Sequence, residues 1–169
     1  MATSTYSPSD VSFKLYGIFD VTGFAAGSFI NIQKQGSRFS STVGAQGDVA
    51  RVHNSNDMYQ VTLSLAQSSI WNQVLIAIHE LDESTLVGKF PLTISDGSGD
   101  SLFASSVSWI DTVPDVTYSN GMETRDWSFT CSALSFNLGG NEESSTVAQL
   151  IFSALSLATS STSGGIGAL

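Results

Sequence analysis

The fold is organised around the stretch from Ser37 to Leu65, SRFSSTVGAQGDVARVHNSNDMYQVTLSL. Its second half, from Met58 to Leu65, alternates strictly between polar and apolar residues. A period of two over this length predicts a strand with one buried face. Its first half, from Arg38 to His53, is polar and bends at Gly44 and Gly47. We therefore expect a long arm that projects from the domain and returns to it at the start of this strand.

An arm of this composition has no core of its own, so we expect it to pack against another copy of the chain. Arg38 and Arg51 flank Asp48. These charges either screen one another within the chain or pair with carboxylates of a neighbouring subunit. Long loops of this kind in compact domains are usually functional. The residues that we expect at contacts between subunits are Arg38, Phe39, Val43, Asp48, Val49, Arg51 and His53.

Further alternating segments place the domain in the mainly β class. They are Val11 to Phe19, with Gly17 as a bulge, Ser28 to Gln33, Phe90 to Ser95, Leu102 to Ile110 and Trp127 to Ala133. The first two are predicted to pair as a hairpin. Pro91 predicts that its strand begins at a sheet edge. Phe103, Val107 and Trp109 are expected on one face of their strand.

One amphipathic helix is predicted over residues 68–81, where apolar residues recur at helical spacing from Ile70 to Leu81. We expect Ser68 and Ser69 to cap it. The polar segment from Asp82 to Thr85 signals the end of the helix. Such a helix is expected to lie on the sheet.

At 169 residues the chain fits one domain with appendages. We divide it into a flexible N-terminal arm (1–10), a main domain (11–138) that includes the long arm (37–56), and a C-terminal extension (139–169). The extension is expected to be partly helical or flexible, with an amphipathic helix over Ser144 to Ala158.

Charge and cysteine usage restrict the function classes. The chain has six Lys and Arg and fifteen Asp and Glu, which gives a net charge of -9. This charge argues against a nucleic-acid-binding protein. The chain has a single cysteine, Cys131, so an intrachain disulfide framework is excluded. The simplest expectation is therefore that the protein is located in a reducing cytoplasm. The N-terminus lacks the features of a signal peptide, and no apolar run approaches the ~18 residues of a membrane helix.

Enzyme and metal hypotheses find no support in the residues. His53, in a polar loop, and His79, on the exposed side of the helix, stand alone, without ligand spacing. Cys131 lies in a strand among apolar neighbours and is interpreted as a small buried hydrophobe. The segment from Asp96 to Asp100 is interpreted as a turn, because it lacks the later ligands of a calcium loop. We expect no catalytic residues, no metal and no cofactor.

The order of several segments resembles that of the tail tube proteins of contractile-tailed bacteriophages. The matching segments are GFAAGSFI (23–30), FSSTVGAQGDVAR (39–51), VTLSLAQSSIWN (61–72), FPLTISD (90–96) and RDWSF (125–129). They span most of residues 11–136, and the resemblance lies in the series rather than in any single motif.

This resemblance implies a β-sandwich or barrel-like tube subunit that assembles into six-fold rings, which stack into a hollow tube. Strands of neighbouring subunits would continue one another into an inner barrel, the helix would face the sheath outside, and the arm from Arg38 to Asn56 would contact adjacent subunits. The implied partners are the chain itself, the tail sheath, a tape-measure protein and DNA in the lumen, and baseplate and terminator proteins at the ends. The implied location is the virion tail, assembled in the host cytoplasm.

Two alternatives remain. One is the tube of a type VI-like or phage-tail-like injection system, which has the same fold; a phage gene would be expected beside sheath and tape-measure genes. The other is a β-sandwich binding module that uses Trp109 or Trp127 as a stacking platform. Both tryptophans share predicted strand faces with apolar residues, so burial in the core is favoured for them.

Overall fold

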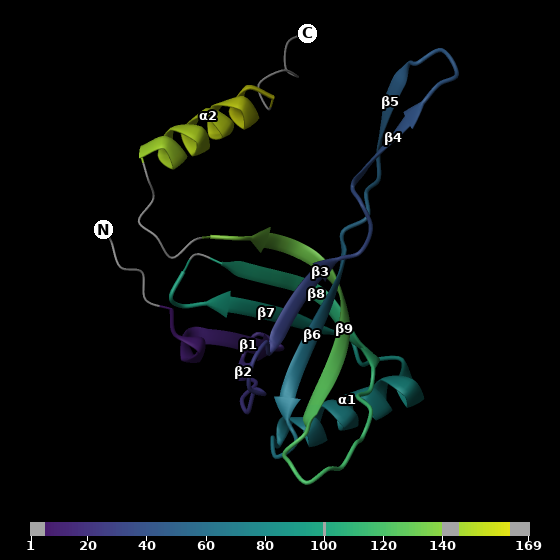
Figure 1. Ribbon diagram of the computed structural model, residues 1–169, viewed down its shortest axis with the longest axis vertical. Helices are drawn as coiled ribbons and strands as arrows, with labels where there is room; N and C mark the ends of the chain where they lie inside the picture. Colours follow the sequence, from purple (N-terminus) through teal and green to yellow (C-terminus); the bar gives the residue numbers. More distant parts are fainter. Residues whose placement is uncertain (1–5, 100, 140–145, 163–169) are drawn as a thin grey trace.

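The computed structural model describes residues 6–99, 101–139 and 146–162. The predicted mainly β class is confirmed: a seven-stranded sheet carries a two-stranded hairpin and helix α1 (Figure 1). The elements, after a 3-10 turn at Pro8–Asp10, are β1 (Val11–Leu15), β2 (Phe19–Asp20), β3 (Ile30–Lys34), β4 (Phe39–Val43), β5 (Val49–His53), β6 (Met58–Ala66), α1 (Trp71–Thr85), β7 (Phe90–Asp96), β8 (Leu102–Thr112), β9 (Thr124–Asn137) and α2 (Thr146–Thr162). Much of the predicted flexible N-terminal arm (1–5) and of the C-terminal extension (140–145 and 163–169) lies outside the described residues.

The sheet is antiparallel throughout, in the order β2-β1-β7-β8-β9-β6-β3. Its longest strands, β8 and β9, lie in the middle and span 11 and 14 residues. Its edges are short, because β2 has two residues and β3 has five. The sheet therefore combines a well-paired centre with two edges that pair on one side only.

The sheet is rolled around its own core. The rings of Phe13 in β1 and Phe129 in β9 lie 5.7 Å apart between centroids, although β7 and β8 separate these strands in the sheet. The predicted alternation of β6 is confirmed, since every second residue from Tyr59 to Leu65 is buried. The largest fully buried side chains include Trp127, Phe13, Phe90, Phe103 and Phe129. Burial of such rings accounts for much of the stability of the fold.

Helix α1 is fixed to one end of the sheet by a buried side chain and a polar link. Leu75 is fully buried in the core. The Trp127 indole N–H donates a 2.9 Å hydrogen bond to the Asn72 side-chain oxygen, and the Asn72 amide donates to the carbonyl of Ala66 at the end of β6. The helix begins at Trp71 rather than at residue 68, and its N-cap is Ile70 rather than one of the predicted serines. It continues to Thr85, four residues beyond the predicted end at Leu81, and closes at Leu86, which adopts a positive φ of 59°.

The predicted pairing of the first two strands is wrong. β1 pairs with β2 and β7, whereas β3 pairs with β6, so that β1 and β3 lie near opposite edges of the sheet. Gly17 is not a bulge. Tyr16 and Gly17 both have positive φ, 54° and 73°, and form the tight turn that reverses the chain from β1 into β2. A short local hairpin therefore replaces the longer one that alternation alone indicated.

The predicted edge position of Pro91 is also wrong. β7 lies between β1 and β8, away from both edges. Its register against β8 shifts between Phe90 and Leu92, and Pro91 occupies this irregularity. A proline is tolerated there because the bulge does not require its missing N–H. The Pro91 carbonyl still accepts a 2.9 Å hydrogen bond from the Tyr16 N–H.

In β8 the predicted shared face of Phe103, Val107 and Trp109 is wrong. The register shifts between Ser105 and Val107, which reverses the alternation along the strand. Phe103 is buried, whereas Val107 is 38% exposed and Trp109 is half-buried. Trp109 therefore lies outside the core. The predicted burial of Trp127 is confirmed at 2% exposure, which removes it as a stacking platform for a ligand.

Candidate assembly surfaces

The arm is a β4–β5 hairpin that projects from the body of the molecule (Figure 1). Its two strands pair from Phe39 opposite His53 to Val43 opposite Val49. At the tip, the Gly44 N–H donates to the Asp48 carbonyl at 2.7 Å, and Gly47 has a positive φ of 89° that suits glycine. Every residue of both strands is exposed. The backbone groups of the two strands thus pair with each other, whereas the side chains of both strands stay exposed to solvent.

Five of the seven predicted contact residues share one face of the hairpin; they are Phe39, Val43, Val49, Arg51 and His53. The Arg51 guanidinium lies 3.6 Å from the centre of the Phe39 ring, and this ring lies 5.3 Å from that of His53. His53 is therefore part of a strand, and the predicted polar loop at this position is wrong. Apolar rings and a cation on one exposed face are typical of protein–protein contact surfaces.

The other two predicted residues lie at the ends of the hairpin. Arg38, at its base, forms an ion pair with Asp57, a partner that the sequence pattern did not predict, and Asp48 occupies the turn at the tip. Both members of the ion pair are about half exposed, so it contributes little to stability. The base of the hairpin is also closed by a backbone hydrogen bond, in which the Asn54 N–H donates to the Arg38 carbonyl at 2.7 Å.

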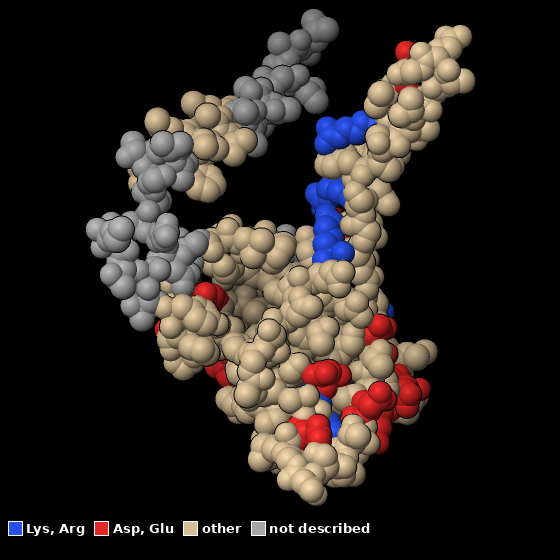
Figure 2. All heavy atoms as spheres, in the orientation of Figure 1, with Lys and Arg blue, Asp and Glu red and all other residues tan. Residues whose placement is uncertain are grey.

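Charge is distributed unevenly over the molecule. Residues 34–53 hold three cations and one carboxylate, so the remaining residues hold three cations and fourteen carboxylates. The segment therefore carries +2 and the rest of the chain -11. Figure 2 shows Lys and Arg side chains along the stalk of the hairpin and many Asp and Glu side chains at the far end of the body. The excess positive charge of this segment comes from Lys34 and Arg38 at the base of the hairpin, because Arg51 and Asp48 within the hairpin cancel each other.

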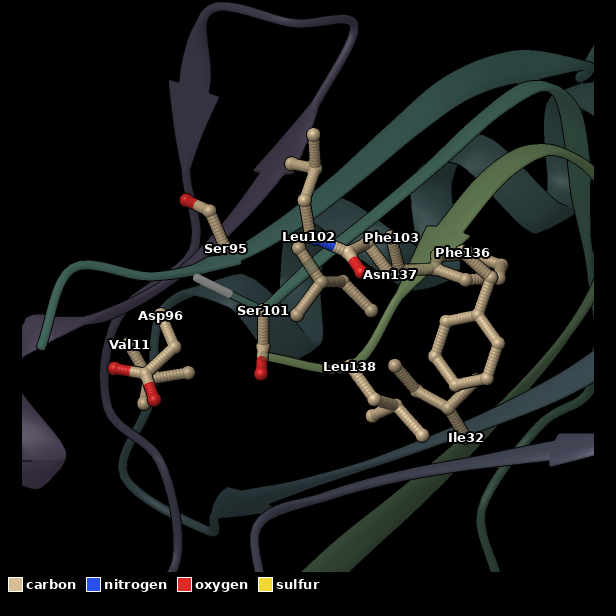
Figure 3. Close-up of a pocket in the computed structure, with 11 residues that line it drawn as sticks. Val11, Ile32, Ser95, Asp96, Ser101, Leu102, Phe103, Phe136, Asn137 and Leu138 are labelled. Carbon is tan, nitrogen blue, oxygen red and sulfur yellow. The ribbon is translucent and has the colours of Figure 1, made fainter. Parts of the chain in front are cut away.

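The two ends of the sheet order form a second candidate surface. In the described part of the chain, β3 pairs only with β6, and β2 pairs only with β1. Val11 of β1 and Ile32 of β3 line the same apolar hollow of about 80 Å³, together with Phe103, Phe136 and Leu138 (Figure 3). The rolled sheet is therefore open along this side, and its edge strands have backbone groups available to another strand.

The buried arginine Arg125 was not predicted from the sequence. It is 7% exposed, and its guanidinium donates hydrogen bonds of 3.3 Å to the carbonyls of Asp115 and Thr117. These contacts hold the loop 113–123 against the body. The alternation of Trp127, Phe129 and Cys131 extends backwards to this position and was the available signal.

The titratable residues singled out in the sequence have local partners in the structure. His79 is not on the exposed side as predicted; its side chain is 19% exposed and lies 3.3 Å from Glu83. Among the described residues, no three His, Cys, Asp or Glu side chains converge as metal ligands. Asp96 accepts hydrogen bonds from the Ser98 backbone and hydroxyl, as a turn residue does, and Asp100 lies outside the described residues.

Cys131 has the character of a buried hydrophobe. It is 0% exposed, and burial raises the pKa of its thiol to about 11, although a hydrogen bond with Ser108 acts in the opposite direction. A thiol of this kind is almost entirely protonated at neutral pH and is a poor nucleophile. As for membranes, no helix within the described residues has the length and apolar character needed to cross one.

Comparisons with known proteins agree with this description. The family model described as bacteriophage PhiTE tail tube protein matches residues 3–139. Structural protein ORF10 of Pseudomonas phage KPP10 is 36% identical over 148 residues, covering 83% of this chain and 86% of that protein. The fold is similar to that of the tube-terminating cap of the anti-feeding prophage, with a TM-score of 0.51 and 15% identity over 78% of this chain and 90% of the cap chain. The chain therefore belongs to the PhiTE tail tube protein family of bacteriophages and is a structural phage protein, not an enzyme.

Proposed function

We propose that this chain is the subunit of the inner tail tube of a contractile-tailed phage, and that its copies form hexameric rings stacked into a conduit for DNA. The observation that carries the proposal is the β4–β5 hairpin, a 15-residue segment from Phe39 to His53 whose strands contain no buried residue. A domain with a completed core has no internal use for such a projection. A neighbouring copy supplies the missing contact surface.

The open sheet supports ring formation. The edge at β3 and the edge at β1–β2 lie at opposite ends of the strand order. Pairing of one edge with the other edge of the next copy is heterologous, and such contacts close into a ring when the rotation per copy is right. The sheet edges are then covered by the assembly rather than exposed to unrelated chains. The number six comes from the resemblance to contractile tail tubes.

The outer face of the sheet, which points away from the core, supports a lumen through which DNA passes. Small polar side chains on this face bind one another: Ser12 with Ser95 at 2.7 Å, Gln60 with Ser128 at 3.0 Å, and Ser64 with Asp126 at 2.6 Å. A surface of this kind, in a chain of net charge -9, has no cation cluster to hold phosphates. DNA would slide past it without binding.

The remaining partners are the tail sheath around the tube, a tape-measure protein in the lumen, and baseplate and terminator proteins at the two ends. The location is the virion tail, after assembly in the host cytoplasm. A second candidate is the tube of a phage-tail-like injection system, because the fold is shared with the anti-feeding prophage cap. Sheath and tape-measure genes of a phage beside this gene would favour the first candidate.

Negative-stain electron microscopy of the purified chain at rising concentration tests the proposal. We expect rings and then tubes with an open lumen, either spontaneously or on addition of a baseplate that initiates assembly. Monomers at every concentration that also fail to extend an added baseplate would contradict it.

A further inference from the structure

Helix α2 (Thr146–Thr162) is apolar around most of its circumference and contains no Asp, Glu, Lys or Arg. Its polar residues recur at helical spacing along one narrow stripe, which includes Gln149, Ser153 and Ser156. Two serine hydroxyls of this stripe donate 2.8 Å hydrogen bonds to carbonyls within the helix. Its apolar side chains are nevertheless exposed, by 65%, 55% and 68% at Leu150, Ile151 and Phe152. A helix of this composition is usually buried, so we expect a further surface to cover it.

The hollow on the open side of the rolled sheet has a matching character. Apolar residues make up most of its lining (Figure 3). Its rim is uncovered, since Leu102, Phe136 and Leu138 are 41%, 39% and 76% exposed. Its volume of about 80 Å³ is far below the roughly 300–1,000 Å³ of small-molecule pockets. The hollow therefore suits inserted apolar side chains rather than a small-molecule ligand.

The path of the chain brings α2 to this hollow. Phe136 at the end of β9 and Leu138 just beyond it both line the hollow. Seven peptide bonds join Gly139 to Thr146, the first residue of α2, and they span at most about 25 Å. Such a short tether gives α2 an effective concentration on the order of millimolar at its own hollow, which a second copy in dilute solution does not reach.

Another apolar hollow, between Tyr16 and helix α1, fits α2 less well. It lies at the far end of the body from the start of α2 (Figure 1). Helix α1 also carries the carboxylates of Glu80, Asp82 and Glu83, which an uncharged helix does not complement.

We propose that α2 packs over the hollow of its own chain, with Ile151 and Leu155 inserted beside Leu102 and Phe136. These two α2 residues are four apart and so lie on one face of the helix, while the polar stripe faces water. The helix lies outside residues 3–139, which match the tail tube family, and is therefore an addition to the tube domain.

A docked α2 lies against both ends of the strand order. Val11 of β1 and Ile32 of β3 line the hollow. In the described part of the chain β3 pairs only with β6, and β1 pairs with β2 only at Lys14 and Leu15. A helix about 10 Å across between these strands hinders a neighbouring copy from pairing with them. Docked α2 therefore holds back ring formation until it is displaced, a consequence that rests on the proposed tube function.

Disulfide trapping in the purified, unassembled chain tests the docking. The variant combines Leu102→Cys with Ile151→Cys under mild oxidation, and native Cys131 is buried away from both. We expect an internally linked monomer, seen as a faster band on a non-reducing gel. The matched control combines Leu102→Cys with Ser153→Cys, on the polar stripe but with the same tether. It should link about tenfold more slowly, because a disulfide requires Cβ atoms about 4 Å apart.

The outcomes separate the docking from the tube function. Equal rates in the two variants would overturn the docking, and so would disulfide-linked dimers, which would assign the hollow to a second copy. If circular dichroism shows that the first variant is unfolded, Leu102→Cys with Leu155→Cys replaces it, with the same expected band.

The effect on assembly is measured with the same variant. We expect the oxidised chain to extend an added baseplate only after the disulfide is reduced. Equally fast extension by the oxidised and the reduced chain would overturn the hindrance of ring formation. If the wild-type chain never assembles, the tube function fails, whereas the trapping rates still decide the docking.

Discussion

Strand β6 and the β4–β5 hairpin follow one another in the sequence but differ completely in burial. Val61, Leu63 and Leu65 of β6 are 0% exposed, whereas Val43 and Val49 of the hairpin are 65% and 71% exposed. The same residue type, valine, therefore occurs in both extremes. The difference shows that the core beneath β6 is formed within one chain, whereas the apolar face of the hairpin is left uncovered. We propose that a second chain buries this face.

The energetics of the two regions differ accordingly. Fully burying a valine contributes about 1.5–3 kcal/mol, which β6 gains within the monomer and the hairpin does not. An isolated two-stranded hairpin is marginally stable in water. The hairpin is therefore expected to open locally in the monomer and to become ordered on assembly.

Deleting residues 41–52 has the largest expected effect. The variant should fold with an unchanged thermal midpoint, because no residue of β4 or β5 contributes to the core, but it should no longer polymerise. Analytical ultracentrifugation and circular dichroism of the same sample measure both properties. Loss of the fold itself would mean that the hairpin belongs to the core and would remove its contrast with β6.

Trp127→Ala is expected to lower the free energy of unfolding by about 3–5 kcal/mol, as large-to-small core substitutions do. The substitution removes a fully buried ring and leaves the Asn72 side-chain oxygen without its 2.9 Å partner. Urea denaturation gives the value. Trp109→Ala serves as the matched control. Because Trp109 is half-buried outside the core, its substitution should lower the free energy of unfolding clearly less. Equal losses would contradict the assignment of faces.

The pH dependence of the free energy of unfolding tests the burial of Cys131 in the core. The thiol pKa of Cys131 is raised from 9.0 to about 11 by burial, so above pH 9 the unfolded chain loses this proton before the folded chain does. Stability should therefore fall between pH 9 and 11, by up to about 1.4 kcal/mol per pH unit from this group. Urea denaturation of wild type and of Cys131→Ala at pH 8 and 10.5 isolates the contribution of this thiol, because all other groups titrate in both proteins. An identical pH dependence would contradict it.

The double substitution Val43→Ser and Val49→Ser has the smallest expected effect on the monomer, within about 0.5 kcal/mol, because both residues are on the surface. It should nevertheless raise the concentration at which tubes form, measured by light scattering. Val116→Ser, at another exposed valine (63%), should change neither property. Unchanged tube formation in the double variant would show that this face of the hairpin takes no part in assembly.

Periodicity predicted much of the body. β6, α1 and β9 were located because their alternation or helical spacing is regular over many residues. The failures lie where the period is broken. The bulge between Ser105 and Val107 moved Trp109 to the opposite face, and the one at Phe90 to Leu92 allowed Pro91 into a central strand. Single sequences do not reveal such insertions, because the partner strand defines them.

The assembly surfaces were predictable only in part. The polar, glycine-bent composition of the arm indicated a projection, and alternation in its strands brought Phe39, Arg51 and His53 together on one face. The ion pair between Arg38 and Asp57 depends on the path of the chain at the base and was missed. The apolar hollow between Leu15, Tyr16 and Phe19 on one side and α1 on the other was not predicted either, because α1 lies more than fifty residues later in the chain.

Hydrogen exchange of the backbone amides, measured on monomers and on assembled tubes, is the sharpest test of whether a neighbouring copy completes the hairpin. We predict that the amides of β4 and β5 exchange fast in the monomer and become strongly protected in the tube, while those of β6 are protected equally in both. Hairpin amides that exchange as fast in tubes as in monomers would contradict this prediction and would leave the hairpin without a partner copy.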